Sequence, residues 1–112
     1  MATSKNIKKN KYNAKKTEYN GFTYDSKKEA GYAKKLDLLK MASGNDKVLS
    51  VERQVPYAII VNTVKICTYR LDFKVTYPNR VEHVDVKGML TAIYRLKKKL
   101  MKALHDIDII EV

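Results

Sequence analysis

The spacing of apolar residues changes along the chain and divides it into helical and extended stretches. Apolar positions three and four residues apart indicate one face of a helix, whereas alternation or a short apolar run indicates a strand. Helical spacing holds over residues 26–41 and 90–104, and the extended pattern over 48–77, 81–87 and 107–110. The sequence therefore predicts the order helix, three or four strands, helix, strand.

Local signals refine the β region. Residues 62–63 (Asn-Thr) and 78–79 (Pro-Asn) have turn-forming composition. Pro56 indicates an interruption or an edge position, because proline cannot donate a ladder hydrogen bond. The alternation changes parity near residues 67–68, which predicts a bulge or strand break. We expect an α/β fold built on a mixed central sheet.

A composition change near residue 20 separates an arm from the rest of the chain. Residues 1–20 are rich in lysine and asparagine, poor in apolar residues, and contain Glu18 as their one acid. They predict a flexible basic arm that folds onto a nucleic-acid backbone, or merely a solvated tail. Residues 21–112 are expected to form a single domain. The arm lysines assigned to phosphate contact are Lys8, Lys9, Lys11, Lys15 and Lys16.

Charge narrows the choice of partner. The chain has 23 Lys plus Arg against 12 Asp plus Glu, a net charge of +11. This balance favours a polyanion, because neutralising phosphates releases condensed counterions, although acidic membranes and ribosomal RNA attract such proteins too. There is no apolar run of membrane-spanning length and no secretory signal pattern. A lone cysteine, Cys67, fits a reducing cytoplasm, which is where we expect the protein.

Two aspartates and a lysine meet in the predicted hairpin. If Tyr77 pairs with Arg80, then Asp72 lies opposite Asp85, with Lys87 two residues beyond on the same face. Carboxylates directly opposite each other have Cβ atoms about 5 Å apart and repel. A divalent cation between them would remove that repulsion. A neighbouring lysine could position or deprotonate an attacking water, or stabilise charge on a phosphate.

These side chains also have an ordinary interpretation. Asp72 and Asp85 fit a solvated sheet face on which they pair with nearby lysine and arginine side chains. Gln54 lies on an earlier strand, where it assists the site or is simply a polar edge residue. His83 shares the face of Asp85 and is expected to be solvated or to contact phosphate rather than metal.

Glu29 is the third acidic candidate. It shares a helical face with Tyr32 and Leu36, so it is expected to point toward the sheet. The pattern S-x-x-E at residues 26–29 is also the form of a capping box, in which the glutamate bonds back to the start of its own helix. The same side chain cannot fill both roles at once, and the sequence leaves the choice open.

With these residues in view, the chain resembles the PD-(D/E)XK nuclease superfamily. The matching residues are Glu29 on the first helix, Asp72 on a strand, and Asp85-Val86-Lys87 on the next strand. More narrowly, it resembles a family of small phage and prophage proteins known only as a domain of unknown function assigned to that superfamily. That resemblance covers roughly residues 10–112. It rests on TYDSKKEA (23–30), CTYRLDF (67–73), DVKG (85–88) and YRLKKK (94–99).

The resemblance implies a restriction-endonuclease-like core and a metal-dependent endonuclease acting on DNA. Glu29, Asp72 and Asp85 would ligate Mg²⁺ or Mn²⁺, and Lys87 would be the catalytic lysine. Leu71 stands where the superfamily pattern has proline, and Asp85 where glutamate is common; both are frequent variations. Branched or recombination-intermediate DNA is the substrate suggested by analogy, in the cytoplasm of a bacterial host.

The second helix carries the other basic surface. Its apolar residues Ile93, Leu96, Leu100 and Leu104 predict a buried stripe. A cluster of five cations without an acid lies on or beside the opposite face, which predicts a phosphate-tracking surface or an ordinary solvated face. These cations are Arg95, Lys97, Lys98, Lys99 and Lys102.

The functional expectation is a small endonuclease that uses a divalent ion and no small-molecule cofactor. Because so small a core covers little DNA, a homodimer is expected. Two other classes stay open: a non-catalytic nucleic-acid-binding protein with the same fold, and a small phage protein that binds a host protein.

Overall fold

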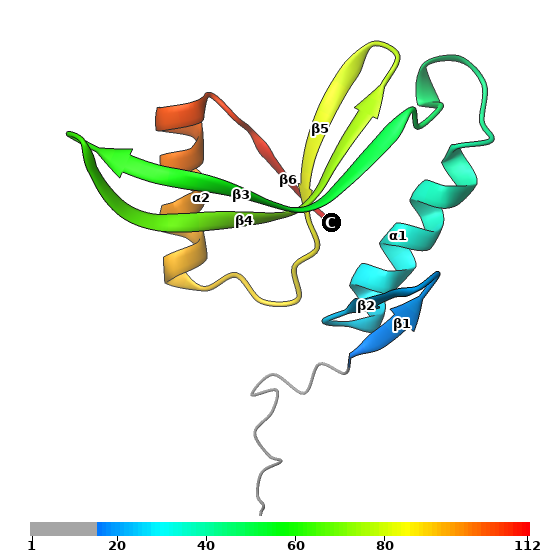
Figure 1. Ribbon diagram of the computed structural model, residues 1–112, viewed down its shortest axis with the longest axis horizontal. Helices are drawn as coiled ribbons and strands as arrows, with labels where there is room; N and C mark the ends of the chain where they lie inside the picture. The colour runs from blue at the N-terminus through cyan, green and yellow to red at the C-terminus, as the bar shows by residue number, and fades with distance from the viewer. Residues whose placement is uncertain (1–15) are drawn as a thin grey trace, which may run out of the picture. The chain divides into compact units, whose positions relative to one another are not determined.

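A computed structural model describes residues 16–112 (Figure 1). Contacts within the chain divide it between Leu38 and Leu39 into two compact units. Among the described residues, no helix is long and apolar enough to cross a membrane.

The first unit contains a small hairpin followed by a helix. Strand β1 (Thr17–Tyr19) pairs antiparallel with β2 (Phe22–Tyr24), and helix α1 (Lys27–Leu39) follows. The hairpin turns at Asn20 and Gly21, which both have positive φ, as a tight two-residue hairpin turn requires. Residues 17–19, at the C-terminal end of the predicted arm, thus form a strand of this hairpin. Lys8, Lys9, Lys11 and Lys15 lie outside the described residues.

The second unit is built on a four-stranded sheet with the order β3-β4-β5-β6. A short 3₁₀ turn, η2 (Gly44–Asp46), precedes β3. The strands are β3 (Ser50–Val61), β4 (Val64–Tyr77), β5 (Arg80–Asp85) and β6 (Ile109–Glu111). The first three strands pair antiparallel, and β6 pairs parallel with β5. The sheet is therefore mixed, and the expected α/β class is confirmed. The expected order of helix, strands, helix and strand is present, but the β1–β2 hairpin precedes it and was not expected.

The local β signals are also confirmed. Pro56 lies in β3, which is an edge strand of this sheet, so its missing N–H interrupts no central ladder. Asn62 and Thr63 form the β3–β4 turn, both with positive φ. The register shifts between Ile59 and Ile60, which leaves Ile66 of β4 as the extra residue of a bulge beside the predicted position.

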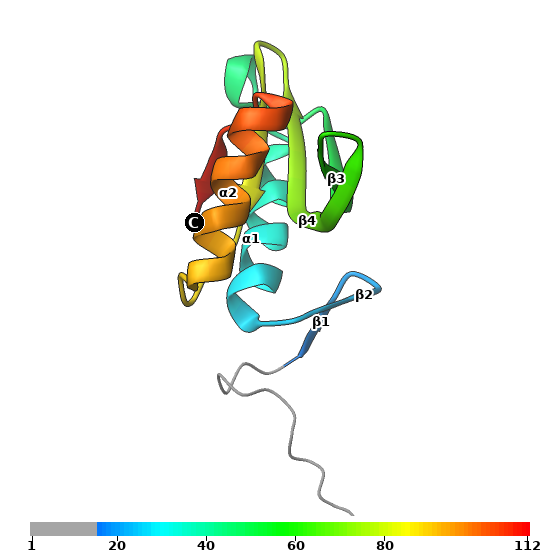
Figure 2. The ribbon, with the colours of Figure 1, turned by 90° about the vertical axis from the view of Figure 1, so that its left-hand side faces the viewer.

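Helix α2 (Ala92–His105) connects β5 to β6 and covers one face of the second unit's sheet (Figures 1 and 2). The core on that face consists of Ile59, Tyr69, Leu71, Tyr94, Met101 and Ile109. The predicted buried stripe is wrong in part. Leu100 packs against this core, but Ile93, Leu96 and Leu104 are exposed. The buried residues of the helix are instead Tyr94 and Met101, which lie two turns apart. The face of α2 that packs against the sheet is therefore the one next to the predicted stripe.

Candidate active site

The β4–β5 hairpin brings two aspartates together. Its register runs from Tyr77 opposite Arg80 to Phe73 opposite Val84, as the sequence predicted. Continued by one residue, this register places Asp72 of β4 opposite Asp85, the last residue of β5. The pairing follows from the short turn, which leaves the alternating apolar positions no other register that buries them.

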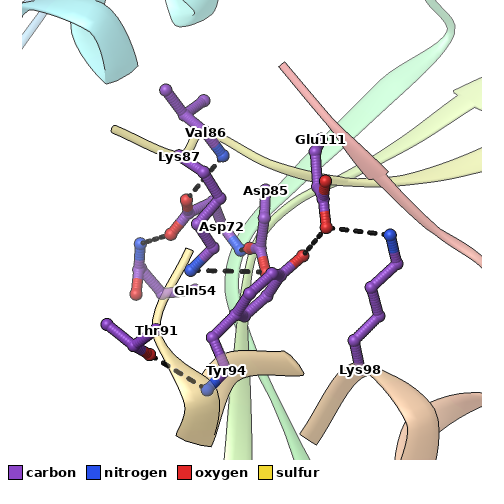
Figure 3. A network of polar contacts seen from close by, with 9 residues as sticks. All are labelled: Gln54, Asp72, Asp85, Val86, Lys87, Thr91, Tyr94, Lys98 and Glu111. Atoms are coloured by element: carbon purple, nitrogen blue, oxygen red, sulfur yellow. Dashed lines mark hydrogen bonds and ion pairs between the residues drawn. The ribbon is translucent and has the colours of Figure 1, made fainter. Parts of the chain in front are cut away.

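Each aspartate accepts a hydrogen bond from the other strand's backbone (Figure 3). The Asp72 amide donates to Asp85 Oδ1 at 2.9 Å, and the Val86 amide donates to Asp72 Oδ2 at 3.0 Å. The two aspartate side chains therefore accept backbone hydrogen bonds at the point where β5 ends and the pairing between the strands stops. Backbone N–H donors offset part of the repulsion between two carboxylates. The arrangement holds both groups in place at the junction of the two strands.

Asp85 is buried, with 1% of its surface exposed. Its Oδ2 atom accepts no hydrogen bond from any group in residues 16–112. The Nζ atom of Lys87 lies 3.8 Å from it, which is an ion-pair distance rather than a hydrogen bond. Burial raises the pKa of the Asp85 carboxyl, while the Asp72 amide and the Lys87 charge act against that rise. A buried carboxylate oxygen that lacks a donor is costly, so it is a natural point for a cation to bind.

Lys87 follows the end of β5, and its side chain is about one-quarter exposed. Its backbone is tied to the last strand, since its amide donates to the Val112 carbonyl at 3.0 Å. Its Nζ atom lies 4.1 Å from the centre of the Tyr94 ring. The lysine thus lies beside both Asp85 and an aromatic ring (Figure 3).

Gln54 also contacts the pair. It lies on β3 between the paired residues Arg53 and Val55, opposite Asp72, and its Nε2 atom donates to Asp72 Oδ1 at 3.3 Å. Its φ of +53° is unusual for a non-glycine residue within a strand. Such backbone strain concentrates at functional sites. The structure therefore places Gln54, the predicted auxiliary residue, against one carboxylate of the candidate site.

Sequence reasoning missed a second layer of contacts. The Tyr94 hydroxyl donates to Glu111 Oε2 at 2.9 Å, and Lys98 Nζ lies 2.8 Å from the same oxygen (Figure 3). Glu111 of β6 is paired in register with Asp85 of β5. The signal available was Thr91, which caps α2 by accepting from the Tyr94 amide and so fixes Tyr94 at the first turn.

Glu29 lies in the first unit, so its membership of this site stays a prediction. Glu29 is buried, with 6% of its surface exposed, and it makes contacts at the start of its own helix. The Glu29 amide donates to Ser26 Oγ at 3.1 Å, and the Asp25 amide donates to Glu29 Oε1 at 3.3 Å. The serine half of the S-x-x-E capping box is therefore present, while the Glu29 carboxylate bonds the amide of Asp25, one residue before Ser26.

The predicted phosphate-binding cations differ in whether they form ion pairs within the protein. Lys98 pairs with Glu111, and Lys102 with Asp106 and Asp108 at 3.0 and 3.1 Å. These two are therefore part of ion pairs, which the sequence pattern did not indicate. Lys16 pairs with Asp25 at 3.2 Å. Arg95 and Lys99 of α2 are exposed, and Lys97 is partly buried.

No group of three His, Cys, Asp or Glu side chains that could hold a metal ion occurs among the described residues. The second unit offers a pair of aspartates, one with a buried carboxylate oxygen lacking a hydrogen-bond donor. Magnesium is commonly held by one or two carboxylates, with water and substrate phosphate completing the shell. The residues present fit that kind of ion better than one requiring a full protein cage.

Fold and site together define a small mixed α/β protein in which two aspartates and a lysine cluster at the end of a central hairpin. The chain belongs to a family described as "Protein of unknown function (DUF1064)", whose model matches residues 9–109. No curated protein and no solved structure matches the chain.

Proposed function

We propose that this protein is a metal-dependent endonuclease that hydrolyses DNA phosphodiester bonds at the Asp72–Asp85–Lys87 cluster. The observation that carries the proposal is the Asp85 carboxylate. It is buried, one of its oxygens lacks a donor among residues 16–112, and a lysine and a second aspartate stand beside it. A solvated sheet face with ordinary surface salt bridges would not bury a carboxylate in this way, because removing the charged group from water has a high desolvation cost.

Asp72 and Asp85 would hold Mg²⁺ or Mn²⁺, since both ions prefer oxygen ligands. When bound, the ion supplies Lewis-acid chemistry at a phosphoryl oxygen. Lys87 brings a positive charge to the same place and stabilises the charge that develops on the phosphate during cleavage. Gln54 holds the Asp72 carboxylate in orientation through its 3.3 Å hydrogen bond.

Glu29 is proposed as a third ligand, as the resemblance to the PD-(D/E)XK superfamily implies. Its bond from the Asp25 amide is 3.3 Å, at the long end of the hydrogen-bond range. Superfamily membership itself is part of the proposal and rests on the residues Asp72, Asp85 and Lys87.

The net charge of +11 supports a DNA substrate, with Arg95, Lys97 and Lys99 of α2 offering cations for its backbone. The arm lysines, and Lys98 and Lys102 of α2, are proposed to contact the DNA backbone as well. By analogy, the substrate is branched or recombination-intermediate DNA in the cytoplasm of a phage-infected bacterium. A homodimer is proposed, because one copy covers little DNA.

The test is a cleavage assay with Mg²⁺ or Mn²⁺ on linear, branched and single-stranded DNA. Asp85→Asn and Lys87→Met should each lower the cleavage rate by about 100-fold or more while DNA binding persists. Lys74→Met is the matched control: it removes the same charge from a partly buried lysine on β4 and should leave cleavage unchanged.

Other outcomes favour the alternative classes. DNA binding without cleavage by the wild type, with both ions and every DNA shape, would favour a non-catalytic nucleic-acid-binding protein. Absence of DNA binding at low salt would favour a phage protein that binds a host protein.

A further inference from the structure

We infer that Tyr94 is a positioning residue for Lys87, with the face of its ring holding the ammonium group beside Asp85. The inference rests on the proposed function and deepens it, because it explains how the lysine is kept at the reaction centre. It names a residue of α2 that the nuclease proposal does not otherwise use. It also gives a role to Glu111 and Lys98, which anchor the ring.

The geometry around Lys87 sets the problem. Lysine has a long side chain with several rotatable bonds, so a fixed backbone does not fix its charge. The separation of 3.8 Å from Asp85 Oδ2 gives attraction but little directionality. The Tyr94 ring centre lies 4.1 Å from the same Nζ atom, well within the range of a cation–π contact. The ring therefore supplies a surface on which the ammonium can rest.

Tyr94 is held at both ends. Its amide donates to the Thr91 hydroxyl at 3.1 Å, and its own hydroxyl donates to Glu111 at 2.9 Å. Only 7% of the residue is exposed, and the ring packs near that of Tyr69, with centres 6.5 Å apart. A ring fixed by the helix start, the core and the neighbouring strand has little freedom to turn away from Lys87.

The charges keep this anchor intact across the neutral range. Hydrogen bonds from Lys98 and then Tyr94 lower the pKa of the Glu111 carboxyl, so it stays an ionised acceptor. Burial, and then the bond to Glu111, raises the pKa of the Tyr94 phenol, so it stays a donor. The ring accordingly remains neutral, and its face remains attractive to a cation.

The ring matters most once a metal is bound. The bound cation would then offset the negative charge of Asp85, and the attraction of Asp85 for Lys87 would weaken. The Tyr94 contact depends on the ring quadrupole and not on a carboxylate, so it survives this change. Tyr94 would keep the ammonium at the site when Asp85 no longer can.

The test is NMR of the full chain with ¹³C-labelled lysine, with Lys87→Arg used to assign the Lys87 signal. A ring face over the amine shifts the Lys87 ε-protons upfield of the other lysines. Tyr94→Leu should return the signal to the common position, and Tyr94→Phe should keep it displaced. Tyr77→Leu is the matched control, because Tyr77 is another buried tyrosine with a cation, Arg80, 3.9 Å from its ring centre.

Kinetics provide the second readout. Tyr94→Leu should lower kcat by about 3- to 30-fold without changing KM for DNA, the range expected for one cation–π contact. Tyr94→Phe should retain most of the rate, and Tyr77→Leu all of it. If Tyr94→Leu does not fold, Tyr94→Met fills similar space without a ring and carries the same expectations.

An undisplaced Lys87 signal in the wild type, or one unmoved by losing the ring, would overturn the inference. So would a Tyr94→Phe variant as slow as Tyr94→Leu, because the hydroxyl and not the ring would then matter. A wild type that cleaves no DNA would count against the proposed function alone, since the NMR comparison still decides whether Tyr94 places the ammonium.

Discussion

Asp72 and Asp85 are the same residue type in different environments. Asp72 is partly exposed and accepts hydrogen bonds on both oxygens, from Gln54 and from the Val86 amide. Asp85 is buried and has one oxygen without a donor among the described residues. Of the two carboxylates, Asp85 is therefore the one whose negative charge destabilises the folded protein more. A bound cation should change the properties of Asp85 more than those of Asp72.

Replacing Asp85 by Asn should stabilise the metal-free protein at neutral pH. Burial raises the pKa of Asp85 above its ordinary 3.8, so the folded state binds a proton more tightly than the unfolded state. The stability from this group is fully present below pH 3.8 and is lost as the pH rises through the folded-state pKa. Asn does not titrate, so the stability advantage of Asp85→Asn over the wild type should grow as the pH rises above 3.8. It should be largest above the folded-state pKa of Asp85.

Melting temperatures of the wild type and Asp85→Asn, measured with a chelator from acidic to neutral pH, would test this. An advantage of the variant that does not grow with pH would show that burial of the charge is not the cause.

Asp72 should behave differently. Asp72→Ala leaves the Val86 amide without its acceptor and should cost about 1–3 kcal/mol of unfolding free energy, whereas Asp72→Asn should cost less. Repulsion between two carboxylates, the expectation from sequence, would make either change stabilising. Urea unfolding of the two variants separates these views, and an Asp72→Ala protein at least as stable as the wild type would refute the hydrogen-bond account.

At the scale of elements, the hairpin could be predicted and the helix orientation could not. The β4–β5 register followed from alternation on the two sides of a turn, because slipping by one residue would move every apolar side chain to the other face. On α2, two apolar faces compete. Ile93, Leu96 and Leu104 have the stronger pattern, but the sheet packs against Tyr94 and Met101. Local periodicity cannot tell which face a tertiary partner covers.

The orientation of α2 makes a prediction of its own. Met101→Ala should cost about 2–5 kcal/mol, because Met101 is completely buried in the core of the second unit. Ile93→Ala, on the exposed face, should change stability by about 0.5 kcal/mol or less. Chemical denaturation of both variants is the measurement, and the reverse ranking would restore the stripe expected from sequence.

At the scale of the whole molecule, the sequence predicted the mixed α/β class and four of the residues that meet in the second unit, namely Gln54, Asp72, Asp85 and Lys87. Glu111 and Tyr94 were not predicted, because their hydrogen bond depends on how α2 packs against β6, which the local sequence pattern does not determine. Glu29 belongs to the first unit, where it makes contacts at the start of α1. Its part in catalysis stays a proposal.

The central claim is that Asp72 and Asp85 hold a divalent cation beside Lys87. Crystals of the full chain soaked in Mn²⁺ would test it directly, because manganese can be located by its anomalous scattering. The account predicts one anomalous peak within bonding distance of Asp85 Oδ2 and the Asp72 carboxylate, absent from crystals of Asp85→Asn. A map without a peak there, or with manganese only on scattered surface carboxylates, would contradict it.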